Sequence, residues 1–145
     1  MNQLKKSGGM IISFTNQPGI SRGEAKREEF ESELKGFGFD KVYLCPHQQN
    51  EGCNCRKPST GMLLQAAEDN NLNLNQCFVI GDRWTDMLAA KDAGCIQVLV
   101  KTGARVEYGT TSLFNYRSRF SGRVQKIFVQ QSGQFVDNRN FYFEY

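Results

Sequence analysis

The chain has 145 residues, 39% of them apolar, with 18 Lys and Arg against 15 Asp and Glu. This length predicts a single domain with one core. No apolar run approaches the roughly 18 residues of a membrane-spanning helix, which excludes an integral membrane protein. The first residues lack the pattern of a secretory leader, so we expect a cytoplasmic protein. Five cysteines without an export signal favour free thiols or a bound metal over a disulfide framework.

The net charge of +3 comes entirely from the C-terminal part of the chain. Residues 1–104 hold 12 basic and 12 acidic side chains, whereas residues 105–145 hold six basic and three acidic ones, together with ten of the 17 aromatic residues. This change in composition predicts an α/β domain over residues 10–104. A short segment over residues 1–9 precedes it, and a divergent basic, aromatic-rich segment over residues 105–145 follows.

Apolar runs and stretches rich in helix formers alternate along residues 10–104. The apolar runs predict buried strands at Met10–Thr15, Lys41–Cys45, Cys77–Gly81 and Ile96–Val100. Helices are expected over Glu24–Lys35, from a cap at Ser59 or Thr60 to about Asn70, and over Trp84–Ala93. The repeated strand–helix–strand order predicts an open, doubly wound, Rossmann-like α/β fold with a parallel sheet. Ligands of such sheets bind beyond the carboxyl ends of the strands.

The segment over residues 105–145 shows no helical period near its end. Val124–Val129 and Gln134–Val136, on either side of Ser132-Gly133, predict a β-hairpin. A basic, aromatic-rich segment is also compatible with binding to single-stranded nucleic acid. Because the excess of three charges is small and phenylalanines more often pack, we expect no nucleic-acid partner.

Three thiols and the single imidazole of the chain fall within 11 residues of one loop, at Cys45, His47, Cys53 and Cys55. Four such ligands predict a closed tetrahedral zinc site that stabilises the loop and leaves no position for a substrate. Ordinary loop thiols are the alternative. A redox pair is disfavoured because Cys-x-Cys lacks the two-residue spacing of thioredoxin-like sites. Cys77 and Cys95 border buried strands and are expected to be inert.

Three further groups suggest a site for phosphate. Arg56-Lys57-Pro58 places two cations before a helix, which suits an anion, although such a pair is often only solvated. Thr15-Asn16 ends the first strand and offers a hydroxyl, with plain turn chemistry as the alternative. Asp82 follows the third strand, with Asp86 four residues later. These carboxylates suit Mg²⁺, while a helix cap is the simpler explanation of Asp82.

In this order the motifs resemble the zinc-containing branch of the haloacid dehalogenase-like phosphatases, which act on sugar phosphates and on histidinol phosphate. The resemblance covers residues 10–104 and depends on four stretches. They are Phe14–Gly23, then Cys45-Pro46-His47 with Cys53–Pro58, then Gly81–Asp86, and Val98–Gly103. A small phosphate ester is therefore the expected partner of a monomeric protein.

The resemblance also implies roles for single residues. Thr15 becomes the phosphate-binding hydroxyl, Lys57 the cation that neutralises the phosphoryl group, and Asp82 the Mg²⁺ ligand. Asp86 becomes an outer-shell partner of the metal, while Asn16, Arg22 and Arg56 contact phosphate or substrate. The remaining implied residues are the zinc ligands Cys45, His47, Cys53 and Cys55.

The family's reaction begins with an Asp-x-Asp-Gly-Thr run that this sequence does not contain. Its first Asp attacks phosphorus to form an aspartyl-phosphate and its second acts as general acid and base, whereas the first Asp here is Asp40. In the family this strand lies between the Thr15 and Asp82 strands, so its omission would leave a gap in the sheet. We therefore expect an inactive domain, truncated or completed by a second polypeptide, with weakened Mg²⁺ binding. The alternative is a non-catalytic, zinc-stabilised phosphate-binding or interaction module.

Overall fold

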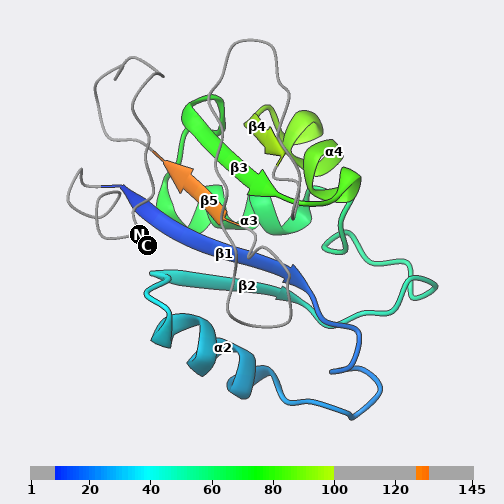
Figure 1. Cartoon of the computed structure of the whole chain (residues 1–145). Coiled ribbons are helices and arrows are strands. Elements are labelled where there is room, and N and C mark those ends of the chain that lie inside the picture. Colours follow the sequence, from blue (N-terminus) through cyan, green and yellow to red (C-terminus); the bar gives the residue numbers. More distant parts are fainter. Residues whose placement is uncertain (1–8, 100–126, 131–145) are drawn as a thin grey trace.

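The computed structural model describes residues 9–99 and the strand over residues 127–130. The elements are β1 (Met10–Asn16), α2 (Arg27–Gly36), β2 (Lys41–Cys45), α3 (Gly61–Asn70), the 3₁₀ turn η1 (Leu74–Gln76), β3 (Cys77–Gly81), α4 (Trp84–Ala93), β4 (Ile96–Leu99) and β5 (Ile127–Gln130). They form one α/β unit around a five-stranded sheet (Figure 1). Within the described ranges, no helix is long and apolar enough to cross a membrane.

The predicted strands and helices of the first hundred residues are confirmed with small shifts at their ends. The helix expected from Glu24 begins at Arg27, because the backbone N–H of Glu24 is held in a turn by Gly19 and Lys26 is extended. Helix α4 has the predicted bounds and ends at Gly94, whose φ of +82° is readily accessible to glycine. The predicted strand end at Val100 lies outside the described residues.

The predicted side-chain cap of α3 is wrong. The residue before this helix, Thr60, has nearly helical backbone angles and makes no capping bond, and Ser59 lies one residue further out. The first helical N–H instead donates to a backbone carbonyl, from Gly61 to Asn54 at 2.9 Å. An unpaired N–H at the start of a helix can be satisfied by backbone as well as by a side chain. This contact attaches the helix to the loop that holds the thiols.

The order of the strands is β2-β1-β5-β3-β4. Strands β1 and β2 are parallel, as are β3 and β4, but β5 is antiparallel to both of its neighbours. The sheet is therefore mixed rather than wholly parallel, and the expected gap between the Thr15 and Asp82 strands is filled. The strand that fills it comes from the segment predicted as a hairpin.

Strand β5 pairs with only the first part of each neighbour. Its partners are Met10–Ser13 of β1 and Cys77–Ile80 of β3. These bonds satisfy backbone groups that two separate half-sheets would leave unpaired at their edges. The second strand of the predicted hairpin lies outside the described residues.

Helix α2 packs against β2, while α3 and α4 pack against each other and against β2, β3 and β4 (Figure 1). Alternate residues of β1 point to opposite faces of the sheet. Ile12 and Phe14 belong to the core shared with α3 and α4, where Leu63 and Ala89 are also buried. This packing fixes the ends of β1 and β3 relative to the loops that follow them.

Candidate functional site

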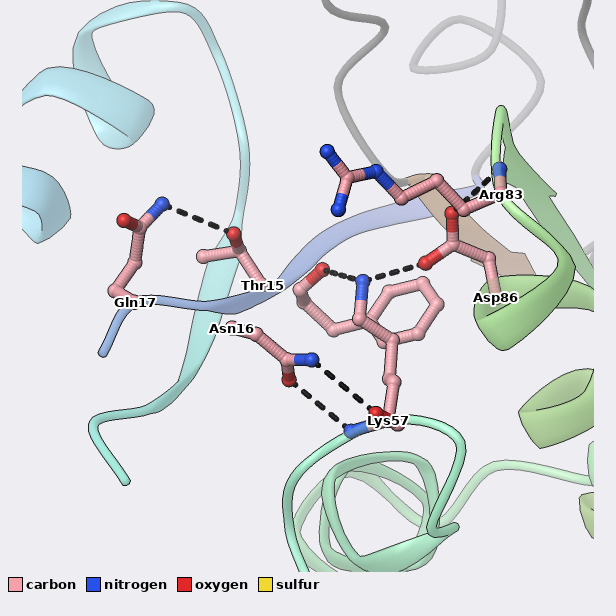
Figure 2. A network of polar contacts seen from close by, with 7 residues as sticks. Thr15, Asn16, Gln17, Lys57, Arg83 and Asp86 are labelled. Atoms are coloured by element: carbon pink, nitrogen blue, oxygen red, sulfur yellow. Dashed lines mark hydrogen bonds and ion pairs between the residues drawn. The ribbon is translucent and has the colours of Figure 1, made fainter. Parts of the chain in front are cut away.

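Polar contacts converge on Lys57, in the turn that precedes α3 (Figure 2). The Lys57 side chain is only 3% exposed. Its Nζ donates to the carbonyl oxygen of Phe14 at 3.3 Å and to Oδ1 of Asp86 at 2.6 Å. It also lies 4.4 Å from the centre of the Phe14 ring. A buried ammonium requires such partners, because an unpaired charge is costly away from water.

The amide of Asn16 holds the backbone of Lys57 from the end of β1. Its Nδ2 donates to the carbonyl oxygen of Lys57 at 3.3 Å, and its Oδ1 accepts from the N–H of Lys57 at 3.1 Å (Figure 2). A primary amide satisfies a peptide donor and acceptor at once in this arrangement. Asn16 therefore positions the turn that carries Lys57.

Asp86 is fully buried and bonded through both carboxylate oxygens. Oδ1 accepts from Lys57, and Oδ2 accepts from the backbone N–H of Arg83 at 3.2 Å. The second bond satisfies a donor at the start of α4, where a carboxylate also interacts favourably with the helix dipole. A Cβ added at Gly81 would lie 2.6 Å from Cβ and Oδ2 of Asp86. Glycine at this position thus allows the carboxylate to approach the end of β3.

The other predicted phosphate-site residues lie in different surroundings. The hydroxyl of Thr15 accepts from the side-chain amide of Gln17 at 3.1 Å (Figure 2). Arg22 is exposed and forms two bonds to Glu24, at 2.8 and 2.9 Å. The bond raises the pKa of Arg22 and lowers the pKa of Glu24. Asp82 follows Gly81 at the carboxyl end of β3 and is partly buried.

The structure thus brings together the end of β1, the Lys57 turn and the start of α4. Asn16, Lys57 and Asp86 make direct contacts, whereas Arg22 is paired within its own loop. The roles of these residues toward phosphate stay predictions.

The four predicted zinc ligands form one cluster after β2. The Sγ of Cys45 lies 3.1 Å from that of Cys55 and 3.6 Å from that of Cys53. Nδ1 of His47 lies 3.2 Å from the Sγ of Cys55 and 3.5 Å from that of Cys45. All four donor atoms lie within 4.8 Å of one another. Tetrahedral ligands at zinc–sulfur distances near 2.3 Å would be about 3.8 Å apart, so this set could hold a zinc ion.

The three clustered thiols differ in acidity. Burial raises the pKa of Cys45 to about 12 and also raises the pKa of Cys55. Burial opposes ionisation of Cys53 as well, but hydrogen bonds from the Arg56 backbone and the neighbouring thiols outweigh it and lower its pKa to about 7. Metal binding requires thiolates, so a cation at the centre would be needed to deprotonate all three.

The Cys/His cluster and the Lys57 turn are connected by direct contacts. Nη1 of Arg56 donates to the carbonyl oxygen of His47 at 3.1 Å, and Lys57 is the next residue. A Cβ added at Gly61 would lie 2.3 Å from the backbone oxygen of Asn54, so the loop also packs directly on the start of α3. Ordering the loop therefore orders the turn that carries Lys57.

A cleft of about 350 Å³ lies beside this turn. Its walls are formed by the loop after β2, the turn over residues 56–59 and the start of α4. The lining residues are Gln48, Gln49, Gly52, Cys53, Arg56, Lys57, Pro58, Ser59, Trp84 and Thr85. They include two cationic residues and no carboxylate. The volume lies within the range of about 300–1,000 Å³ that is typical of small-ligand sites.

A magnesium site is less complete than the thiol cluster. Within the described ranges, the only group of three or more His, Cys, Asp or Glu side chains close enough to share a metal is the Cys/His cluster. Both oxygens of Asp86 are already bonded to protein groups, so the magnesium ligand implied by the family resemblance is Asp82, the first residue after β3. Mg²⁺ bound through one protein carboxylate requires further oxygens, as from a phosphate.

Several structural roles were missed by sequence reasoning. Gln17 holds the Thr15 hydroxyl, Gly61 packs on the thiol loop, and Trp84 lines the cleft. Of these three residues, only Trp84 could have been identified from the sequence. An aromatic residue close to Asp82 at the start of a helix is not explained by packing of the core. The roles of Gln17 and Gly61 depend on contacts that no local pattern specifies.

Comparisons with known proteins agree with the motifs. A family profile described as HAD-hydrolase-like matches residues 54–114. D-glycero-beta-D-manno-heptose-1,7-bisphosphate 7-phosphatase of Pasteurella multocida is 36% identical, covering 80% of this chain and 72% of the relative. The enzyme of the same name from Haemophilus ducreyi is 35% identical, covering 73% of this chain and 68% of the relative.

Solved structures give the same result. The D,D-heptose 1,7-bisphosphate phosphatase of B. bronchiseptica, crystallised with magnesium and phosphate, aligns with a TM-score of 0.59 at 31% identity. This alignment covers 68% of the present chain and 60% of that chain. A HAD-like phosphatase from Mesorhizobium loti aligns with the same TM-score at 28% identity, covering 73% of this chain and 59% of that chain. The chain thus spans about three fifths of either structure, and it belongs to the haloacid dehalogenase-like phosphatases, in the branch that carries a Cys/His metal-binding loop.

Proposed function

We propose that this chain binds the phosphate ester of a small sugar in the cleft beside Lys57, and that these 145 residues do not hydrolyse it. The observation that carries the proposal is the cleft itself, which has Arg56 and Lys57 in its lining and no carboxylate. The Arg56 guanidinium is the cation that this partly enclosed site offers to a phosphate dianion, since the Lys57 ammonium is already paired with buried Asp86. Relatives named for a heptose bisphosphate support a sugar as the remainder of the ligand.

We infer the absence of hydrolysis from the positions of the Asp side chains within residues 9–99. Asp40, the first Asp of the sequence, accepts from the backbone N–H of Ile11 near the amino end of β1, away from the Lys57 turn at its other end. Asp86 is bonded to Lys57 and Arg83, and Asp82 is the implied metal ligand. The aspartyl-phosphate route of the family needs a further carboxylate positioned to attack phosphorus. In this chain β5 occupies the position between β1 and β3 from which the family supplies it.

Zinc and magnesium play different roles in the proposed function. Zinc bound by Cys45, His47, Cys53 and Cys55 would hold the loop that forms one wall of the cleft. Magnesium, when bound, would neutralise charge on the phosphate, with Asp82 as its protein ligand. We expect the metal to bind weakly unless a phosphate ester is present.

Calorimetry and a phosphate-release assay on the zinc-loaded full chain test the proposal together. Titration with a hexose phosphate in the presence of Mg²⁺ should give saturable heat, while phosphate release stays at the level of the buffer. Arg56→Gln should weaken binding by roughly 10-fold to 100-fold, the effect of losing a hydrogen bond to a charged group. Lys91→Gln, on an exposed face of α4, is the matched control and should leave binding unchanged.

The outcomes separate the proposal from its alternatives. Clear Mg²⁺-dependent turnover would show that a different group attacks phosphorus. Absence of binding by a folded, zinc-loaded chain would favour an interaction module without a phosphate site. Histidinol phosphate, the other ester implied by the family resemblance, serves as a competing ligand and is expected to bind less tightly than the sugar phosphate.

A further inference from the structure

Trp84 is largely exposed to solvent, so packing of the core does not require an aromatic residue at this position. It is the single tryptophan of the chain and the first residue of α4, and its exposed fraction is 69%. An indole is among the largest apolar surfaces that a protein can present to water. An exposed tryptophan that lines a cleft is therefore a candidate for contact with a ligand.

The cleft presents different chemistry at its two walls. Arg56 and Lys57 lie in the turn at one side, and Trp84 with Thr85 forms the start of α4. The carboxamides of Gln48 and Gln49 belong to the loop after β2 and line the same cleft. A ligand that fills it would have an anionic group near the cations, an apolar face against the indole and hydroxyls within reach of the amides.

A pyranose phosphate has all three features. The C–H groups on one face of the ring form an apolar surface, the hydroxyls at its edge donate and accept hydrogen bonds, and the phosphate is anionic. Aromatic rings bind such a face through dispersion and hydrophobic contact, with little loss of side-chain freedom. An acyclic phosphate ester has no comparable face to place against Trp84.

The exposed apolar surface of α4 has a second member, Leu88, which is 36% exposed and follows Trp84 by one helical turn. A protein partner would be expected to use both residues. Only Trp84 belongs to the lining of the cleft, in common with the cations. The placement therefore favours a ligand in the cleft over a docked helix.

We infer that Trp84 determines specificity in this cleft by stacking on the ring of a sugar phosphate whose phosphate lies at the Arg56–Lys57 turn. The inference rests on the proposed phosphate site and adds the part that recognises the ring. It gives Trp84 a binding role for the sugar, separate from the charge recognition of the turn.

Fluorescence of this single tryptophan reports directly on the inference. The zinc-loaded full chain is titrated with glucose 6-phosphate, glycerol 3-phosphate and inorganic phosphate, and binding of each is measured in parallel by calorimetry. Glucose 6-phosphate should shift the emission and protect the indole from quenching by acrylamide. Inorganic phosphate and glycerol 3-phosphate should bind without either effect.

Variants separate stacking from folding. Trp84→Ala should weaken glucose 6-phosphate binding by about 5-fold to 10-fold and leave inorganic phosphate binding unchanged, whereas Trp84→Phe should retain most of the affinity. Leu88→Ala is the matched control on the same helix and should change neither. If all three phosphates bind but Trp84→Ala weakens them equally or not at all, the stacking role is refuted while the phosphate site stands. If no phosphate binds the folded chain, the phosphate site itself fails, and the stacking role with it.

Discussion

At the scale of single residues, the Lys57–Asp86 pair connects parts of the chain that are distant in sequence. Lys57 belongs to the turn before α3, Asp86 lies in α4, and the same Nζ contacts the carbonyl oxygen of Phe14 in β1. Ion pairs this deeply buried add modest net stability but are costly to break, because removal of one partner leaves an isolated charge. Their main effect is to define one arrangement of the three segments.

A double-mutant cycle tests this coupling. Lys57→Met and Asp86→Asn should each lower the free energy of unfolding by about 3–5 kcal/mol, because each removes the opposite charge that lies 2.6 Å from a buried ionised group. The double variant should lose clearly less than the sum of the two, since it buries no uncompensated charge. Urea unfolding of the four proteins measures the coupling energy. Additive losses would mean that the contact is energetically unimportant.

Gly81 is required by the position of Asp86. Gly81→Ala would place a Cβ 2.6 Å from the carboxylate, so either the end of β3 or Asp86 must move. We expect a loss of about 1–3 kcal/mol in unfolding free energy together with weaker phosphate binding. Gly36→Ala is the matched control, because its Cβ would meet nothing within 4 Å and Gly36 is the last residue of α2, so we expect little change in stability. Equal effects of the two substitutions would contradict this account.

At the scale of elements, we expect the loop between β2 and α3 to depend for its order on a metal ion bound by the Cys/His cluster. Its contacts are the Cys/His cluster itself, the bond from Arg56 to the His47 carbonyl and the bond from Gly61 to the Asn54 carbonyl. Metal binding to such a loop contributes to folding free energy, because the site is not preformed in the unfolded chain.

Removal of zinc should therefore affect the cleft before it affects the sheet. Chelation is expected to lower the melting temperature and to abolish binding of a hexose phosphate, while much of the helical circular dichroism remains. Cys55→Ser should reproduce both effects without chelator. Cys95→Ala, at a core cysteine outside the cluster, should retain phosphate binding and its loss on chelation, whatever its effect on the melting temperature. Unchanged phosphate binding in the metal-free chain would show that the loop orders without the ion.

The elements that sequence predicted well are those set by local pattern. Strands β2 and β3 and helix α4 have the predicted bounds because continuous apolar runs and a following glycine determine them. The Cys/His cluster was also predictable, since its four ligands lie in one loop. The capping of α3 was not, because its partner is the backbone of Asn54 rather than a side chain.

At the scale of the whole molecule, two parallel pairs of strands are joined into one sheet by β5. The strand was partly predictable from its residues, but its position was not, because pairing with both β1 and β3 depends on segments more than 40 residues away. The residues of the proposed phosphate site show the same division. Its residue types were visible in sequence, whereas the engagement of Asp86 by Lys57 and the pairing of Arg22 with Glu24 required the folded chain.

Two thiols outside the Cys/His cluster are buried in the fold, Cys77 in β3 and Cys95 before β4. Burial raises the pKa of Cys77 to about 12, with a smaller effect from Cys95, and it raises the pKa of Cys95 to about 11, from an ordinary value of 9.0. The unfolded chain therefore releases these protons at lower pH than the folded chain does. The contribution of these two thiols to the free energy of unfolding is constant below pH 9. It falls as the pH rises from about 9 toward 11 or 12.

The expected slope is about 1.4 kcal/mol of unfolding free energy per pH unit for each thiol within that window. Cys77→Ala with Cys95→Ala should lower stability at pH 8 but show a shallower fall between pH 9 and 11 than the parent. Urea midpoints of the zinc-loaded proteins, measured at half-unit steps, give the difference in slope. Val79→Ala, fully buried in the same strand as Cys77, removes packing without a titrating group and should lower stability equally at every pH. A double variant whose stability falls as steeply as the parent's would mean that other groups, such as Tyr43, control the alkaline limit of the fold.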